Sequence, residues 1–339
     1  MQQAFDTLVS RLVPEGGKIL LAVSGGVDSM CMAVLFKKYG KIPFSIAHCN
    51  FRLRGADSDS DENLVCDWAR ANRVECFCES YETAEYASRH GISTEMAARE
   101  LRYAFFSRLC REKGFCATAV AHNAGDNAET LILNLLRGTG GRGLRGMSEL
   151  STLPAMPPHA GGVPTDGILL LRPLLRFSRA EIEEFARTGS IVFHKDVTND
   201  SLNYKRNRIR HEVFPSFEKI NPSYLQTLTK DMEHFAQLCD IADDYFDDAF
   251  SQISVTAEGK APSGQMPLVA VSIKRLLALK HWEYVLWRVL EPYNLSQETF
   301  GKLTALLGSG RTISGKVFES PTHIVYIKLK TLLVDVRNN

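Results

Sequence analysis

The residues near the N-terminus that are best suited to chemistry form one short loop. In order they are Ser24, Gly25, Gly26, Val27, Asp28 and Ser29. A strand-forming run precedes the loop and a helical pattern follows it, so the backbone N–H groups that begin the helix attract an anion. The two glycines remove Cβ atoms that would keep phosphate oxygens from the backbone, and both permit positive φ. The serine hydroxyls add donors, and the loop therefore predicts a phosphate-binding site.

Asp28 indicates that a cation accompanies the phosphate. A carboxylate beside a phosphate is repulsive unless a cation lies between them, and Mg²⁺ bound by a carboxylate together with phosphates is the usual solution. The Gly-x4-Gly-Lys-Ser/Thr loop and the Gly-x-Gly-x-x-Gly pattern are both absent at this position. The alternative is a plain glycine turn in which Asp28 only satisfies the helix dipole.

A second group of candidate residues follows a predicted strand at 117–122. His122 ends this strand, at the carboxyl edge where open α/β sheets bind ligands. Asp126 and Glu129 lie three residues apart on one face at the start of a predicted helix, where they can hold an ammonium group, accept its proton or share Mg²⁺. We expect Asp28 and Asp126 to bind the metal, but the sequence does not separate these roles. Solvated helix charges and a purely structural histidine are the alternatives.

Several arginines and one lysine suit contacts with phosphates. Arg99 and Arg102 share a helical face, and of the two we favour Arg102 for binding phosphate or stabilising developing negative charge. Two basic clusters flank the candidate site, next to glycines in the first and to the aromatic Tyr204 in the second. They comprise Arg137, Arg142 and Arg145, and then Lys205, Arg206, Arg208 and Arg210. Clustered cations beside an aromatic ring predict contact with RNA, and solvated surfaces are the alternative.

The elements that must position these residues alternate between short β-rich runs and longer helical patterns. Strands are predicted at 18–23, 42–48, 74–79 and 117–122, and helices at 28–39, 59–72, 93–113 and 126–137. Because the strands are apolar on both sides of the pleat, they predict a doubly wound, mostly parallel α/β sheet with crossover helices.

Two domains are expected in 339 residues. Residues 1–218 form the predicted catalytic domain, with a flexible loop at 151–167, a strand at 168–175 and a helix that Ser178 and Glu181 cap. Residues 219–339 read as a mainly helical C-terminal domain with a short β tail at 322–336. The predicted helices of this domain span 225–250, 273–290 and 296–307.

Composition is that of an ordinary globular protein, with 45% hydrophobic and 23% charged residues and a net charge of +1. No apolar stretch is long enough to span a membrane and the N-terminus does not resemble a signal peptide, so we expect a cytoplasmic protein. Its eight cysteines contain no Cys-x-x-Cys pair. We expect buried, reduced thiols without a zinc site, with Cys76 and Cys78 on opposite faces of a strand.

The loop sequence SGGVDS resembles the pyrophosphate-binding loop of the PP-loop ATP pyrophosphatases, which split ATP between its α and β phosphates. Further blocks are similar to the tRNA(Ile)-lysidine synthases of that superfamily: AHCNFRLRGADSDSDENLV (47–65), EMAARELRYAFF (95–106), AHNAGDNAETLILNLLRGTGGRGLRGM (121–147), RPLL (172–175) and DVTNDSLNYKRNRIRHEVFP (196–215). Asn123 and Gly125 depart from the family pattern, which often has histidine and an acidic residue there.

The resemblance implies the substrates and the reaction. ATP adenylates O2 of the wobble cytidine in a tRNA(Ile) with a CAU anticodon, and the ε-amine of free L-lysine then attacks C2 and expels AMP. It implies that the loop and His48 bind ATP with Mg²⁺, and that Asp28, Arg102, His122, Asp126 and Glu129 do the chemistry. The C-terminal domain is expected to bind tRNA, and the oligomeric state stays open, a homodimer included.

Two other functions remain compatible with the sequence. A PP-loop tRNA thiolase is disfavoured because the chain offers no Cys-x-x-Cys or paired catalytic cysteines. A non-catalytic RNA-binding module that responds to ATP is disfavoured because pure binding does not require Asp28, Asp126 and Glu129.

Overall fold

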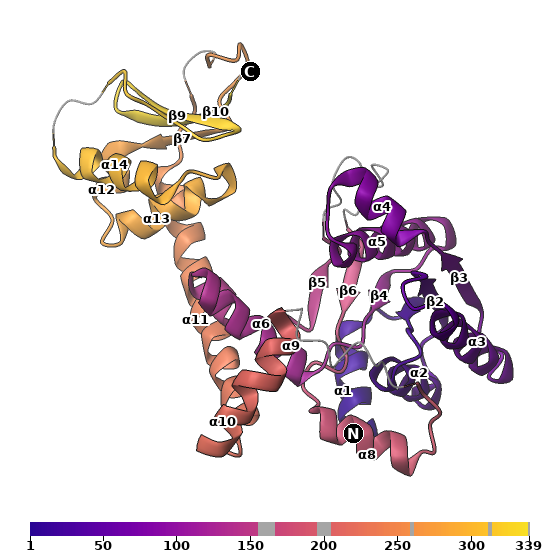
Figure 1. Cartoon of the computed structure of the whole chain (residues 1–339). Helices are drawn as coiled ribbons and strands as arrows, with labels where there is room; N and C mark the ends of the chain where they lie inside the picture. Colours follow the sequence, from indigo (N-terminus) through magenta and orange to yellow (C-terminus); the bar gives the residue numbers. More distant parts are fainter. Residues whose placement is uncertain (155–166, 195–204, 258–260, 311–313, 338–339) are drawn as a thin grey trace. The chain divides into compact units, whose positions relative to one another are not determined.

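The structure is a computed structural model, and it describes residues 1–154, 167–194, 205–257, 261–310 and 314–337 (Figure 1). The chain divides into two compact units, Met1–Ala236 and Gln237–Asn339. The first unit therefore extends beyond residue 218, where the sequence places the end of the catalytic domain.

A six-stranded sheet forms the centre of the first unit, in the order β3-β2-β1-β4-β6-β5. Every neighbouring pair is parallel except β5 and β6. The strands are β1 Ile19–Ala22, β2 Phe44–Asn50, β3 Cys76–Ser80, β4 Ala117–Ala119, β5 Leu150–Thr152 and β6 Leu169–Leu171. The predicted doubly wound, mostly parallel fold is confirmed.

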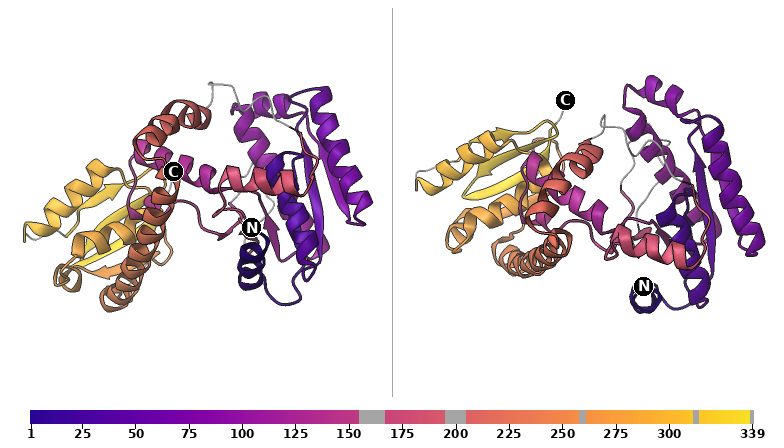
Figure 2. Two further views of the ribbon diagram at one scale, coloured as in Figure 1. Left: turned by 90° about the horizontal axis from the view of Figure 1, so that it is seen from below. Right: turned by 60° about the horizontal axis from the view of Figure 1, so that its bottom comes forward.

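Helices cover both faces of this sheet (Figures 1 and 2). Ile19 and Leu21 of β1 point to a core shared with α1, α2, α3 and α8, whereas Leu20 points to a core shared with α5. All three side chains are fully buried, which explains why the strand is apolar at every position. These helices are α1 Gln2–Leu12, α2 Val27–Tyr39, α3 Ala56–Ala71, α5 Thr94–Lys113 and α8 Arg179–Thr188.

The remaining helices of the first unit lie in three parts of the chain: after β3, after β4 and from residue 205 onward. They are α4 Thr83–His90, α6 Ala124–Arg137, α7 Gly141–Leu144, α9 Lys205–Arg208, the π-helical turn η3 Ile209–Val213 and α10 Phe214–Ile220. Pro215 has no N–H to donate, and the Phe214 N–H bonds to the Ile209 carbonyl five residues back, which defines the π turn. The long helix α11, Tyr224–Ile253, crosses from the first unit into the second.

Local sequence signals predict some of these elements better than others. Ser178 accepts a hydrogen bond from the Glu181 N–H while the Glu181 carboxylate accepts one from the Ser178 N–H, so the predicted capping box of α8 is confirmed. The sequence missed α4 and β5. Strand β5 begins just before the predicted flexible loop at 151–167 and ends inside it, and residues 155–166 of that loop lie outside the described part of the chain.

The second unit contains more β structure than the predicted tail. Its four-stranded antiparallel sheet has the order β7-β10-β9-β8. The strands are β7 Val269–Ser272, β8 Val317–Glu319, β9 His323–Lys328 and β10 Thr331–Val336, and the helices are α12 Ile273–Leu277, α13 Trp282–Leu290, the 3₁₀ turn η4 Glu291–Tyr293 and α14 Gln297–Gly308. The predicted helix at 273–290 is thus two helices. Strands as short as β7 and β8 carry little periodicity of their own, and pairing with β10 and β9 defines them.

The expectation for the cysteines is corrected in two respects. Alternate residues of a strand share a face, so Cys76 and Cys78 of β3 point to the same side, with their Sγ atoms 3.7 Å apart. Of the eight cysteines, Cys31, Cys110 and Cys239 are buried, and the others are partly or largely exposed.

Among the helices that the structure describes, none is both long enough and apolar enough to cross a membrane.

Candidate functional site

The loop between β1 and α2 adopts a conformation that requires glycine at one position. Gly25 has φ +93°, and a Cβ there would lie 3.2 Å from Cβ of the buried residue Asp61 in α3. Of the two glycines that permit positive φ, Gly25 adopts it and Gly26, with φ −76°, does not. The Gly25 carbonyl accepts a hydrogen bond from the His194 N–H, and the Asp61 carboxylate is 2.8 Å from the His194 ring.

The start of α2 offers backbone donors beside this loop. Gly26 is the N-cap of α2 and no side chain caps the helix, so the first N–H groups of the helix are available to a ligand. Ser29 Oγ is 3.1 Å from Ser24 Oγ and also accepts from the Ser24 N–H. The two serines fix the loop as well as offering hydroxyls, which suits a phosphate cradle.

A cavity of about 350 Å³, the loop cavity, opens at the carboxyl ends of β1, β2 and β4. This edge is where parallel α/β sheets bind ligands. Polar groups of the loop line one side and apolar or aromatic side chains another. The lining comprises Ala22, Val23, Ser24, Gly26, Asp28, Ser29, Ala47, Cys49, Phe51, Arg102, Tyr103, Phe106, Val120, Ala121 and His122. Arg102, which lies over the Phe51 ring at 5.2 Å, lines the loop cavity, and Arg99, which lies over Tyr103, is not part of the lining.

His48 lines an adjoining outer cavity of about 540 Å³, which shares Ser24, Phe51 and Arg102 with the loop cavity. His48 Nδ1 is 2.8 Å from the Val23 carbonyl oxygen, which can only accept, so Nδ1 carries the proton. Burial lowers the pKa of His48. Its buried Nε2 has no hydrogen-bond partner among the described residues and is therefore an acceptor ready for a ligand.

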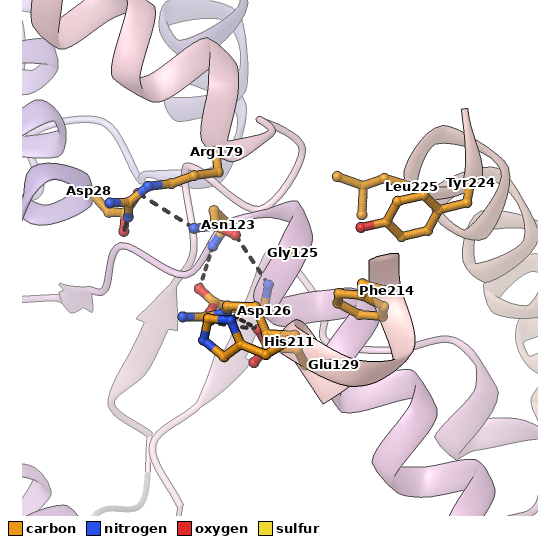
Figure 3. A pocket seen from close by; sticks show the side chains of 11 residues that line it. Asp28, Asn123, Gly125, Asp126, Glu129, Arg179, His211, Phe214, Tyr224 and Leu225 are labelled. Carbon is orange, nitrogen blue, oxygen red and sulfur yellow. Dashed lines mark hydrogen bonds and ion pairs between the residues drawn. The ribbon is translucent and has the colours of Figure 1, made fainter. Parts of the chain in front are cut away.

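Asp28 also lines a second cavity, an acidic pocket of about 470 Å³ (Figure 3). Asp28, Asp126 and Glu129 supply its carboxylates, and apolar side chains face them across the pocket: Phe214, Tyr224 and Leu225. Asp28 is common to the acidic pocket and the loop cavity. The structure thus brings together the loop and the second acidic group that the sequence singled out.

Asn123 connects the two acidic groups. Its side chain caps α6 by accepting from the Asp126 N–H, while its amide donates to Asp28 Oδ1 at 3.4 Å. A Cβ at Gly125 would lie 3.1 Å from Asn123 Oδ1. A side chain at position 125 would therefore crowd the Asn123 side chain that caps α6.

Asp28 is held by an arginine that the sequence did not single out. Arg179, at the start of α8, lies 2.6 Å from Asp28 Oδ2. Burial raises the pKa of Asp28, Arg179 opposes that rise, and the nearby Asp126 adds to it. Two neighbouring carboxylates that repel each other fit the oxygen ligands that Mg²⁺ prefers. The described residues therefore suit a divalent cation at Asp28 and Asp126.

Glu129 is the most deeply buried acid of the pocket, with 1% of its side chain exposed. Burial raises its pKa, and the Arg210 guanidinium, 2.7 Å from Oε1, counteracts the rise. Arg206 lies 4.0 Å from Oε2 and donates to Thr130. Of these two arginines, both predicted to contact RNA, Arg210 lines the acidic pocket and Arg206 lines the outer cavity.

The other basic candidates lie at the surface. Arg137, Arg142, Lys205 and Arg208 are exposed, and Arg145 is half-buried. Arg208 forms an exposed pair with Glu212, and Tyr204 lies outside the described residues.

His122 lines the loop cavity, and its buried Nδ1 has no hydrogen-bond partner within the described chain. Burial lowers its pKa to about 4, so the ring is neutral at neutral pH. A neutral imidazole can accept a proton but carries no charge to stabilise a phosphate.

Sequence reasoning missed three contributors to the site: Asp61, Arg179 and His194. The acidic run around Asp61 and the capping box before Arg179 were visible, but neither pattern points to the loop. Their contacts join residues more than a hundred positions apart, as in Arg179 with Asp28 and His194 with Asp61.

Replacing Gly25 should reveal the constraint on the loop. Gly25→Ala forces an L-residue into positive φ and crowds Asp61, so we expect it to lower the free energy of unfolding by about 1–2 kcal/mol. Gly26→Ala is the matched control and should change it by less than about 0.5 kcal/mol, since the nearest atom to the new Cβ is 3.6 Å away. Denaturant unfolding measures both, and equal losses would contradict the assigned loop geometry.

His122 should make the protein less stable as the pH falls. Its pKa of about 4 in the folded chain lies below the ordinary 6.5, so between pH 6.5 and 4 the unfolded chain binds the proton better. We expect an additional loss of stability on acidification, of at most about 1.4 kcal/mol per pH unit, which His122→Gln removes. NMR titration of the imidazole tests this directly, and a ring that charges near pH 6.5 would refute it.

Comparison with known proteins agrees with this geometry. The profile of the PP-loop domain family matches residues 1–217, and that of the TilS substrate binding domain matches residues 267–336. The solved U34-tRNA thiolase NcsA of Methanococcus maripaludis has a similar fold, with a TM-score of 0.54 over 70% of this chain and 79% of that one at 16% identity.

Curated relatives are more similar in sequence. The tRNA(Ile)-lysidine synthase of Parabacteroides distasonis is 34% identical over 313 residues, 92% of this chain and 64% of that protein. That of Chlorobaculum tepidum is 37% identical over 237 residues, 69% of this chain and 67% of that protein. The chain spans less than two thirds of the length of the first of these relatives. With a PP-loop match over most of its length and relatives at this identity, the chain belongs to the tRNA(Ile)-lysidine synthase family of PP-loop proteins.

Proposed function

We propose that this protein uses ATP to join free L-lysine to the wobble cytidine of a tRNA(Ile) with a CAU anticodon. The observation that carries the proposal is the position of Asp28, which lines both the loop cavity and the acidic pocket. A nucleotide in the first and an amine in the second would meet at this residue. Family membership supports the same reaction.

ATP is proposed to occupy the loop cavity with its phosphates against the start of α2. The uncapped N–H groups of α2 and the hydroxyls of Ser24 and Ser29 suit phosphate oxygens. His48 Nε2 can accept a hydrogen bond from the nucleoside. Arg102 is placed to stabilise the negative charge that develops as pyrophosphate leaves.

Asp28 and Asp126 would hold Mg²⁺. The ion would offset the charge of the ATP phosphates beside these carboxylates. Arg179, now paired with Asp28, would have to share or release that carboxylate when the metal binds.

Lysine is proposed to bind in the acidic pocket. With an ordinary pKa near 10.4, only about one lysine in ~2,500 has a neutral ε-amine at pH 7, so the site must take up a proton before attack. Glu129 is a suitable acceptor because burial raises its pKa and brings it nearer to neutral pH. Phe214 and Tyr224 form an apolar wall against which the aliphatic stem can pack.

The two chemical steps then follow from these positions. The C2 carbonyl oxygen of cytidine attacks the α-phosphate of ATP, and pyrophosphate leaves. The neutral ε-amine next attacks C2, AMP leaves, and the attacking nitrogen gives up one further proton to a base, a role that Glu129 can fill only after it has released the first proton to water. The neutral His122 in the loop cavity is a second candidate for this base.

Transfer RNA is proposed to contact the exposed cations Arg137, Arg142, Lys205 and Arg208 of the first unit. Residues 267–336, which match a substrate binding domain, are proposed to supply further contacts in the second unit.

Labelled lysine tests the reaction. When the protein is mixed with ATP, Mg²⁺ and tRNA(Ile), we expect it to transfer [¹⁴C]lysine into RNA. Asp28→Asn should lower this transfer by at least about 10²-fold, which is the usual cost of losing one group that stabilises developing charge. Asp67→Asn, which changes an exposed acid of α3, is the matched control and should retain activity. Tight tRNA binding without any transfer by the unaltered protein would instead indicate an RNA-binding module.

The salt dependence of tRNA binding tests the basic surface. Arg208→Ala should weaken binding and reduce the slope of log K against log salt by about 0.7–0.9, the loss of one phosphate contact. Arg70→Ala, an exposed arginine on α3, should leave the slope unchanged. A slope that is the same in both variants would remove Arg208 from the RNA interface.

A further inference from the structure

Three cysteine thiols meet outside the proposed catalytic site, between α3 and the edge strand β3. Cys66 Sγ is 3.2 Å from Cys78 Sγ, and Cys78 Sγ is 3.7 Å from Cys76 Sγ. Among the described residues, these form the one group of three or more histidine, cysteine or acidic side chains whose ligand atoms all lie within 4.8 Å of one another. We call this group the thiol cluster.

The arrangement arises from the register of the sheet and could not be read from cysteine spacing. Cys76 and Cys78 point to the same side of β3, as do Ile46 and His48, their partners in β2. Helix α3 packs on this side and supplies Cys66. The expectation of no zinc site rested partly on the absence of a Cys-x-x-Cys pair, and the folded chain groups three cysteines without that spacing.

The spacing of the sulfur atoms suits one metal ion. A zinc ion binds thiolate sulfur at about 2.3 Å, and three sulfurs around one such ion in tetrahedral geometry are about 3.8 Å apart. The observed separations of 3.2 and 3.7 Å need only small side-chain adjustments to reach this value. Thiolate ligands select soft d¹⁰ ions such as Zn²⁺ and Cu⁺.

The surroundings favour a bound cation. Glu62, one helical turn before Cys66, adds negative charge close to Cys66 and Cys78. Cys78 is exposed, so an ion can enter and water can complete its coordination. None of the three thiols lines the loop cavity, the outer cavity or the acidic pocket.

We propose that Cys66, Cys76 and Cys78 bind one thiophilic d¹⁰ metal ion, with Zn²⁺ as the reference ion, in a site that ties the edge strand β3 to α3. The same helix carries Asp61, which packs against Gly25 of the loop. The ion thus stabilises the helix that supports the phosphate-binding loop, and it takes no part in the reaction.

Metal binding by the whole, reduced protein tests the site. Zn²⁺ titrated against a chromophoric chelator should bind one equivalent, and Co²⁺ should give thiolate-to-metal charge-transfer absorption. Each of Cys66→Ser, Cys76→Ser and Cys78→Ser should weaken binding by at least about 10²-fold, because even outer-shell partners of a metal contribute ~10–100-fold. Saturating Zn²⁺ should raise the Tm of the unaltered protein by about 5 °C and leave the Tm of these variants unchanged.

Cys116→Ser is the matched control, because Cys116 is a partly exposed cysteine outside the thiol cluster, and it should bind Zn²⁺ like the unaltered protein. Cys78→Ala, at the exposed position, keeps the test valid if a serine variant folds poorly, and it should fold and lose the metal. Failure of the unaltered protein to bind Zn²⁺ or Cu⁺, or equal binding by the variants, would overturn the proposal. A Cys66–Cys78 disulfide trapped in protein taken directly from cells would also overturn it, in favour of a redox pair.

Discussion

The half-buried charge of Asp28 is the constraint on which the arrangement of the first unit's site depends. Its carboxylate stands at the start of α2, beside the loop, where burial and the nearby Asp126 both disfavour the ionised form. A charge in that position must be paired, and Arg179 supplies the partner at 2.6 Å. Arg179 can reach Asp28 because α8 packs against α2 on one face of the sheet. The packing of helices on the sheet therefore determines which charged group lies next to the Asp28 carboxylate.

The same principle governs the acidic pocket. Glu129 is almost completely buried, and Arg210 neutralises it from the π-helical turn. A cationic ligand that enters the pocket meets carboxylates that are already paired. Its affinity then depends on the difference between the new ion pairs and those that it replaces, and not on the attraction of free charges. In both cases an arginine opposes the rise in pKa that burial causes.

Helix α3 links features that look unrelated in the sequence. Its Asp61 fills the space that a side chain at position 25 would need, and it also contacts His194 from the segment after α8. Its Cys66, five residues further along the helix, faces the edge strand β3. One helix, α3, therefore both supports the loop and contacts the edge strand. Because a packed helix is rigid, a shift at one of these contacts also moves the other.

The sequence by itself determined the features that local chemistry controls. A glycine loop between a strand and a helix, apolar strands that must be buried on both faces, and a capping box at Ser178 each depend on residues a few positions apart. Only the tertiary structure decided which distant residues complete the site. Arg179 reaches Asp28 and Cys66 reaches Cys78 because the order of the strands and the packing of helices on them bring these pairs together, and no spacing along the chain encodes that order.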